Sequence, residues 1–166
     1  MKPIKQINNV YGYCRVSTQE QAQNGISLET QKDLIANFIK EKYNREVDEW
    51  FIDDGVSGTV PILERNRCKA MTDVIDRHDV IVATRIDRLS RSAGDMLQTI
   101  PVLEDTGITL YLCEQFGDVP VVYPKSQDEC GLRSKFDMNE MVNKIMLMVL
   151  SAVAEIEHGS TVDKFK

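Results

Sequence analysis

The chain has 166 residues, enough for one domain with its own hydrophobic core. Its composition, 42% hydrophobic and 28% charged, is that of an ordinary globular protein and not of a disordered or fibrous one. The net charge of −6 argues against a surface that is basic all over, so an enzyme acting on nucleic acid would have to concentrate its positive charge locally.

The ends of the chain and its cysteines predict a cytoplasmic protein with no membrane partner, no metal and no small-molecule cofactor. Residues 1–9 are polar and lack the apolar region of a secretory signal. The longest apolar stretch, residues 145–154, contains Ser151 and is too short to span a bilayer. The cysteines are dispersed and the two histidines lie far apart, which favours buried thiols over a zinc site. These residues are Cys14, Cys68, Cys113, Cys130, His78 and His158.

The first half of the chain predicts two strands and two helices. Residues 10–16 are rich in β-forming side chains and predict a strand. Ser27 has the properties of an N-cap and opens a helix that runs to about Tyr43. A second strand is expected over residues 47–52, and a helix over roughly residues 65–77, with a turn-rich loop between them. The predicted buried face of the first helix consists of Leu28, Leu34, Ile35, Phe38 and Ile39.

The alternation continues and predicts an α/β fold. Residues 79–84 read as a strand buried on both faces, and residues 92–106 as a helix stopped by Gly107. A further strand is expected over residues 108–113. The expected architecture is a mainly parallel sheet of four to five strands flanked by helices. Residues 119–123 could add a short edge strand inside a long loop.

Residues 138–157 predict a long helix that completes a two-part organisation. Residues 145–150 are apolar all round, so this part of the helix must be covered on every side. A fully buried core helix would meet that requirement, but in so small a domain we favour a helix shared with a second subunit. The expected division is a catalytic core over residues 1–137 and an oligomerisation helix over residues 138–166.

The first strand carries one half of a candidate site. Alternate strand residues share a face, so Tyr11, Tyr13, Arg15 and Ser17 point one way. This places a guanidinium beside a hydroxyl at the carboxyl end of a strand, where open α/β sheets bind ligands. The spacing alone is more typical of an Arg and a Ser at an exposed strand end.

The second half is the segment of residues 85–91, which follows the buried strand over residues 79–84. Arg88 and Arg91 are three residues apart and would share one side of a helical turn. Asp87 could hold one of them by a charge-assisted hydrogen bond. Together with Arg85, three arginines within seven residues of an acidic protein favour an anionic partner, although a solvated basic turn would show the same pattern.

The two halves together predict phosphoryl transfer. Attack on a phosphodiester builds negative charge on its nonbridging oxygens, and guanidiniums stabilise that charge with bidentate hydrogen bonds. The sequence has no acidic cluster resembling a two-metal site and no phosphate-binding Gly-x-x-x-x-Gly-Lys loop. A metal-free reaction with a serine nucleophile is therefore expected. The general base is not evident, so arginines or a carboxylate must assist deprotonation.

Five segments, in order along the chain, resemble motifs of the resolvase/invertase serine recombinases, and their spacing is most similar to that of the large members. They are residues 13–18 (YCRVST) with Gln21, residues 27–31 (SLETQ), residues 53–58 (DDGVSG) with Glu64 and Arg65, residues 85–91 (RIDRLSR) and residues 150–157 (LSAVAEIE). The resemblance covers nearly the whole chain. A single motif of this length would be weak, but five in order are specific.

The resemblance implies a catalytic domain for site-specific DNA recombination. Ser17 would cut the strand and form a 5′-phosphoserine, and Arg15, Arg88 and Arg91 would bind the scissile phosphate. Asp87 would orient the arginines or share in proton transfer. The residues implied to support the site or bind DNA phosphate are Gln21, Gln31, Arg65 and Arg85.

The resemblance also implies partners, and it leaves alternatives open. Double-stranded DNA would be the substrate, and homodimers would pair into homotetramers through the helix over residues 138–157. Rejoining would need neither ATP nor metal. The chain stops where relatives carry a DNA-binding domain, so we expect a truncation. A catalytically idle dimerisation or regulatory module is the first alternative, and an unrelated arginine-rich phosphohydrolase is the second.

Overall fold

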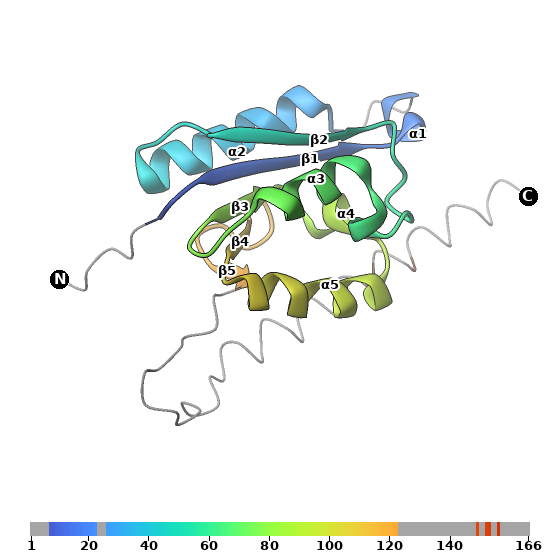
Figure 1. Ribbon diagram of the computed structural model, residues 1–166. Helices are drawn as coiled ribbons and strands as arrows, with labels where there is room; N and C mark the ends of the chain where they lie inside the picture. Colours follow the sequence, from blue (N-terminus) through green and yellow to red (C-terminus); the bar gives the residue numbers. More distant parts are fainter. Residues whose placement is uncertain (1–6, 23–25, 123–148, 150–151, 154–155, 157–166) are drawn as a thin grey trace, which may run out of the picture.

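A computed structural model describes residues 7–22, 26–122, 149, 152–153 and 156 (Figure 1). The sheet of this part has five strands in the order β2-β1-β3-β4-β5. The strands are β1 (Val10–Val16), β2 (Glu49–Asp54), β3 (Val80–Ala83), β4 (Thr109–Leu112) and β5 (Pro120–Val122). The first four are parallel, and β5 pairs antiparallel with β4. The predicted α/β class, the mainly parallel sheet and the short edge strand are confirmed.

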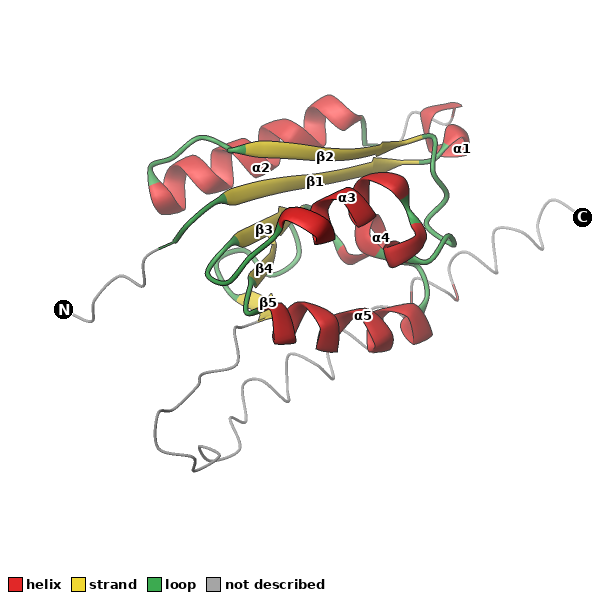
Figure 2. Cartoon of the chain, in the orientation of Figure 1, coloured by secondary structure: helices red, strands yellow, loops and turns green. Residues whose placement is uncertain are grey.

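Helices cover both faces of the sheet (Figure 2). They are α1 (Thr18–Ala22), α2 (Leu28–Tyr43), the 3-10 turn η1 (Ile62–Glu64), α3 (Asn66–Val74), α4 (Ile86–Leu89) and α5 (Ala93–Thr106). On one face α2 buries Ile35 and Ile39 in a core cluster with β1 and β3. On the other face α3 and α5 pack over β1, β3 and β4. Of the predicted face of α2, Leu34 remains 37% exposed, so the buried stripe is narrower than expected.

Strand β1 lies between the helices that cover the two faces of the sheet, and it is buried along its whole length. Tyr11 and Tyr13 belong to the core under α3 and α5, whereas Val10 and Cys14 belong to the core under α2. The predicted alternation of faces is therefore confirmed. Both faces of the strand are buried, because helices cover the sheet on both sides.

Caps fix the ends of the two long helices, at Ser27 and Gly107 as predicted and also at Ser92, which the prediction placed inside the helix. The Ser27 side chain accepts a hydrogen bond from the Thr30 amide at 3.1 Å, and Ser92 does the same for the Asp95 amide at 3.2 Å. Gly107 ends α5 with φ 82°, a left-handed conformation that costs glycine little.

Three local predictions were wrong. Strand β2 runs two residues later than expected, because Asp53 and Asp54 pair with Arg15 and Val16 of β1 instead of starting the loop. Helix α3 ends at Val74, because Ile75 is extended. The short helix α1 was not predicted, since five residues are too few for a periodic pattern.

The described cysteines are free thiols. Cys14 and Cys68 are buried, and burial raises the pKa of each to about 12. Cys113 is only half-buried, in contrast to the predicted strand interior. No three His, Cys, Asp or Glu side chains of the described residues group closely enough to hold a metal ion.

Residues 149, 152–153 and 156 are helical, and the rest of the predicted helix over residues 138–157 lies outside the described residues. Its oligomerising role and the division at residue 137 stay predictions, and Cys130 lies outside the described residues as well. Within the described part, no helix has the length and apolar character needed to cross a membrane.

The order of the strands determines where a ligand can bind. From β1 the chain crosses to β2 on one side and then to β3 on the other, so the winding direction reverses between β1 and β3. In open parallel sheets the crevice at the carboxyl ends of two such strands is the usual ligand site. Ser17 directly follows β1, and residues 85–91 follow β3.

Candidate functional site

Arg15 is a fully buried guanidinium at the carboxyl end of β1. Its nitrogens donate to the carbonyls of Val56, Asp87 and Arg88 at 2.7, 3.0 and 3.2 Å. Val56 lies in the loop after β2, whereas Asp87 and Arg88 belong to α4, so Arg15 joins two segments that are distant in sequence. Burial lowers the pKa of Arg15 to about 10, so the side chain remains charged at neutral pH.

Gln31 holds the backbone of Arg15 from the opposite face. Its side-chain oxygen accepts from the Arg15 amide at 3.2 Å, and its nitrogen donates to the Arg15 carbonyl at 3.1 Å. Strand β1 pairs with β3 from Val10 to Gly12, and the Gln31 amide serves as a backbone partner beyond that point. The family resemblance implies a supporting role for Gln31, and its hydrogen bonds to the Arg15 backbone are the means by which it would support the site.

Replacing Gln31 with leucine is expected to destabilise the fold by about 2–3 kcal/mol, because the buried Arg15 amide loses its partner. Urea unfolding measures this change. Gln21→Leu is the matched control: the exposed Gln21 side chain donates to Asp54 at 2.5 Å, and the loss of this bond should cost about 0.5 kcal/mol or less. Equal losses in the two variants would contradict the role of Gln31.

Arg88 and Arg91 reach the same carboxylate, that of Glu20, from the segment after β3. Arg88 Nη1 and Arg91 Nη2 lie 2.8 and 2.7 Å from Glu20 Oε1. Asp87 Oδ2 accepts from Arg88 Nη2 at 3.1 Å, as expected. The predicted shared helical turn was wrong in detail, because α4 ends at Leu89, yet both arginines point to one place. We call Arg15, Arg88 and Arg91 the arginine cluster.

Ser17 directly precedes α1 and caps it, and Glu20 lies in the first turn of the helix. The Glu20 amide donates to Ser17 Oγ at 3.2 Å, and Glu20 Oε2 accepts from the Ser17 amide at 2.8 Å. This reciprocal pair is a capping box, for which Ser-x-x-Glu is the sequence signature. Glu20 Oε2 also lies 3.2 Å from Arg15 Nη1. One carboxylate thus links Ser17 to the whole arginine cluster.

Glu20 was missed at the level of sequence. The signal was present as Ser17-Thr18-Gln19-Glu20, but nothing local indicates that the same carboxylate meets Arg88 and Arg91. Partial burial alone would raise the pKa of Glu20. The Ser17 amide and the charges of Arg15 and Arg88 outweigh this effect and lower the pKa to about 2. Glu20 is therefore ionised at any physiological pH.

The predicted supporting residues divide into two groups. Arg65 is buried and donates to the Tyr13 hydroxyl at 2.9 Å and to the Arg88 carbonyl at 3.1 Å, so it holds the backbone of Arg88 from the core side of the site. Gln21 is bonded to Asp54, and Arg85 is 43% exposed with its Nε 3.5 Å from Asp87 Oδ1. The structure brings Arg65 and Gln31 into the site and leaves Gln21 and Arg85 at its rim.

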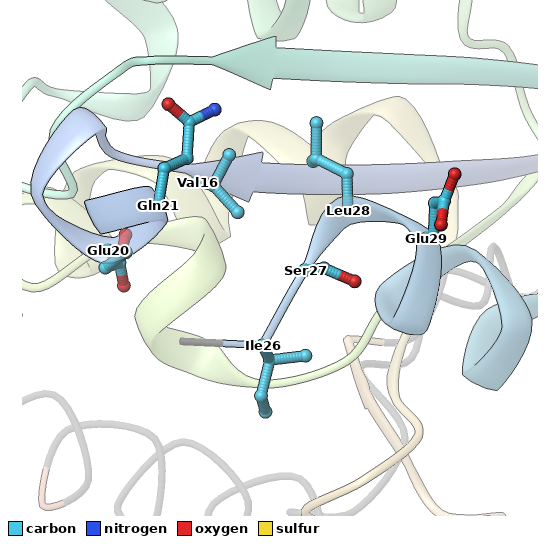
Figure 3. A pocket seen from close by; sticks show the side chains of 7 residues that line it. All are labelled: Val16, Glu20, Gln21, Ile26, Ser27, Leu28 and Glu29. Atoms are coloured by element: carbon cyan, nitrogen blue, oxygen red, sulfur yellow. The ribbon is translucent and has the colours of Figure 1, made fainter. Parts of the chain in front are cut away.

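The site retains spare hydrogen-bonding capacity and open space. Arg88 Nε is buried without a hydrogen-bond partner among the described residues. A hollow of about 370 Å³ lies beside Glu20, between α1 and the start of α2 (Figure 3). Its lining consists of Val16, Glu20, Gln21, Ile26, Ser27, Leu28 and Glu29. The charged guanidiniums of the arginine cluster favour an anion as the ligand of this site. The hollow itself is lined by Glu20 and Glu29 and not by the arginines.

The family model for the resolvase N-terminal domain matches residues 10–166. The chain belongs to this family. It is a serine recombinase N-terminal domain, as the sequence motifs predict. The resemblance to resolvases thus rests on the whole described core and not only on the five motifs.

Curated and solved relatives agree with this assignment. The chain is 27% identical to the transposon Tn2501 resolvase of Escherichia coli and 24% identical to the serine recombinase PinR of Escherichia coli strain K12. Each match covers 95% of this chain, and 68% and 67% of the relative. This resolvase domain therefore spans about two thirds of the length of these proteins.

Two crystal structures resemble the fold of this resolvase domain. The N-terminal catalytic domain of TP901-1 integrase has a TM-score of 0.58 and 25% identity, covering 93% of this chain and 99% of the other. A resolvase family site-specific recombinase from Streptococcus pneumoniae has a TM-score of 0.54 and 27% identity, covering 96% and 93%.

Proposed function

We propose that this chain is the catalytic domain of a site-specific DNA recombinase in which Ser17 is the nucleophile. The observation that carries the proposal is the convergence of the Ser17 amide and three guanidiniums on one carboxylate. A group that binds at that point is anionic and lies directly beside Ser17. A DNA phosphodiester has the required charge and oxygen geometry.

In the proposed reaction one phosphorus–oxygen bond forms while another breaks. Ser17 Oγ attacks the scissile phosphorus and loses its proton, the bond to the 3′ oxygen breaks, and the strand leaves as a 3′-hydroxyl after taking up a proton. The product is a 5′-phosphoserine. Attack by a 3′-hydroxyl reverses each change and restores Ser17. Because the number of phosphoester bonds is constant, the cycle needs no ATP.

The residues around Ser17 have distinct roles in this proposal. The arginine cluster stabilises the charge that develops on the nonbridging oxygens, and its fixed positions reduce reorganisation during the reaction. Asp87 and Arg65 position Arg88 through its guanidinium and its carbonyl. The guanidiniums lower the cost of forming the Ser17 alkoxide, which answers in part the lack of a histidine base.

The wider assembly also belongs to the proposal. Double-stranded DNA is the substrate, and pairs of dimers form a tetramer through residues 138–157. A catalytically idle dimerisation module is the competing function. The complete arginine cluster beside Ser17 favours the active enzyme, because an idle module has no need of three converging guanidiniums.

Trapping on DNA tests the function. The chain is fused to a DNA-binding domain of known specificity and incubated with duplexes that carry its binding site, a randomised centre and a nick that prevents rejoining. We expect a covalent adduct, with mass spectrometry placing the DNA on Ser17. An adduct on another residue would overturn the assignment. Self-association without any adduct would select the idle module.

Gly58→Ala is expected to slow formation of this adduct by about ten- to a hundredfold, because even a small displacement of catalytic groups lowers the reaction rate strongly. A methyl group at Gly58 would lie 2.9 Å from Arg91 Cγ and Cδ and 3.1 Å from Arg15 Nη2, so the cluster must shift. Gly94→Ala is the control, since its nearest contact is the Ser92 hydroxyl at 3.7 Å. Rates are compared by gel at fixed substrate. Unchanged kinetics in Gly58→Ala would contradict the packing argument.

A further inference from the structure

We propose that Glu20 is an internal anion that occupies the phosphate position until DNA displaces it. The inference rests on the proposed function, because it takes the arginine cluster as the phosphate site. It assigns to Glu20 a regulatory role in substrate entry, distinct from the chemical roles of Ser17 and the arginines. Each step below depends on contacts of the described residues.

The first step is the position of the carboxylate. Glu20 Oε1 bonds Arg88 and Arg91, and Oε2 bonds Arg15 and the Ser17 amide. These four partners are the groups that the proposed mechanism directs at the scissile phosphate. Two carboxylate oxygens and two nonbridging phosphate oxygens need the same donors, so they cannot be bound there together.

The second step is the strength of this internal contact. The Glu20 side chain is 15% exposed, and the Arg15 side chain fully buried, so solvent screens their attraction only weakly. The same contacts hold the pKa of Glu20 well below its ordinary range, which keeps the carboxylate charged and bound. The protein without DNA therefore satisfies its own arginines, and an incoming phosphate must compete with Glu20.

The third step is a route for release. The hollow beside α1 is lined by Glu20 itself, so the freed carboxylate can move toward open space without crossing the core (Figure 3). Release also removes the bond from Glu20 to the Ser17 amide, and α1 has only five residues to maintain its first turn. Phosphate entry would thus loosen the turn that holds Ser17 Oγ as a cap and free the nucleophile when the substrate arrives.

Glu20→Gln separates this role from simple capping. Glutamine is nearly isosteric and can still close a capping box, but it carries no charge to compete with phosphate. Binding of inorganic phosphate to the 166-residue chain is measured by thermal shift at constant ionic strength, since a ligand that binds the folded state raises the melting temperature. We expect the half-saturating phosphate concentration to fall about tenfold in Glu20→Gln.

Glu29→Gln is the matched control. Glu29 lines the same hollow and its substitution changes the net charge equally. Among the described residues, the ion pairs of the arginine cluster are with Glu20 and Asp87 and not with Glu29. It should leave the phosphate midpoint within about twofold of the wild-type value, because a solvated charge acts weakly. Glu20→Asp retains the charge on a shorter side chain. It tests the proposal if Glu20→Gln does not fold, and it should lower the midpoint because it cannot span all four partners.

The outcomes separate this inference from the proposed function. If Arg88→Ala abolishes the phosphate response of the wild-type chain while Glu20→Gln binds phosphate no more tightly, the displacement model is wrong and the phosphate site stands. An equal gain in Glu29→Gln would likewise reject it, as a general charge effect. If neither the wild type nor Glu20→Gln responds to phosphate and no adduct forms on Ser17, the proposed function itself fails.

Discussion

Replacing Ser17 with alanine is expected to abolish covalent attachment to DNA, with a loss of about 10⁴-fold or more, because it removes the oxygen that the proposed mechanism uses as the nucleophile. Ser17 Oγ accepts only the Glu20 amide in the described structure. Removal of this cap should destabilise the fold by about 1 kcal/mol, too little to account for lost activity. The adduct yield on the nicked duplexes measures the effect.

Ser27→Ala is the matched control for Ser17→Ala. Ser27 caps α2 in the same manner, with its oxygen 3.1 Å from the Thr30 amide, and the hydrogen bonds of its hydroxyl in the described structure are with Thr30. The two variants should unfold at similar urea concentrations, whereas only Ser17→Ala should fail to attach DNA. Residual adduct in Ser17→Ala, mapped to a different side chain, would show that the nucleophile has been misidentified.

Replacing Arg88 with alanine is expected to lower the rate of adduct formation by about 10²–10³-fold, the typical loss when one fixed donor to a developing oxyanion is removed. Arg88 bonds both Glu20 and Asp87 and is 7% exposed, so its charge is fixed in position before substrate arrives. Arg88→Lys should recover only part of this loss, because an ammonium cannot bind two phosphate oxygens in the planar geometry of a guanidinium.

Arg45→Ala is the control for loss of an arginine. Arg45 bonds the Asn8 carbonyl and Asp48, near the start of β1 and therefore at the opposite end of the strand from Ser17. Its loss should leave the adduct rate unchanged. Single-turnover kinetics at saturating DNA separate slower chemistry from weaker binding. If Arg88→Ala changed only the DNA concentration needed for saturation, Arg88 would bind the substrate equally in the ground and transition states.

Much of the site was predictable because its parts are local. The position of Ser17 after a buried strand, the caps at Ser27 and Ser92, and the pairing of Asp87 with Arg88 all follow from residues that are close in sequence. Such features depend on periodicity, turn chemistry and charge within a few residues. The order of the five motifs then indicated the family.

Other features could not be predicted, because they depend on strand pairing. The register of β1 against β2 places Asp53 opposite Arg15, and thereby brings its carboxylate to the Tyr13 hydroxyl at 3.0 Å. Read alone, Asp53-Asp54-Gly55 has the composition of a turn. Similarly, the buried state of Arg65 depends on carbonyls at Val60 and Arg88, which no local pattern brings together.

The sequence by itself determined the fold class, and it predicted the nucleophile and the arginines, because alternating polarity, helix caps and short motifs are encoded within each segment. Only the tertiary structure decided that Glu20 holds these arginines. Its partners Arg88 and Arg91 are 68 and 71 residues away, and they meet it only because β1 and β3 are adjacent in the sheet and end at the same edge. Long-range electrostatic contacts of this kind follow from the topology of the sheet, which brings together charges that are far apart in the sequence.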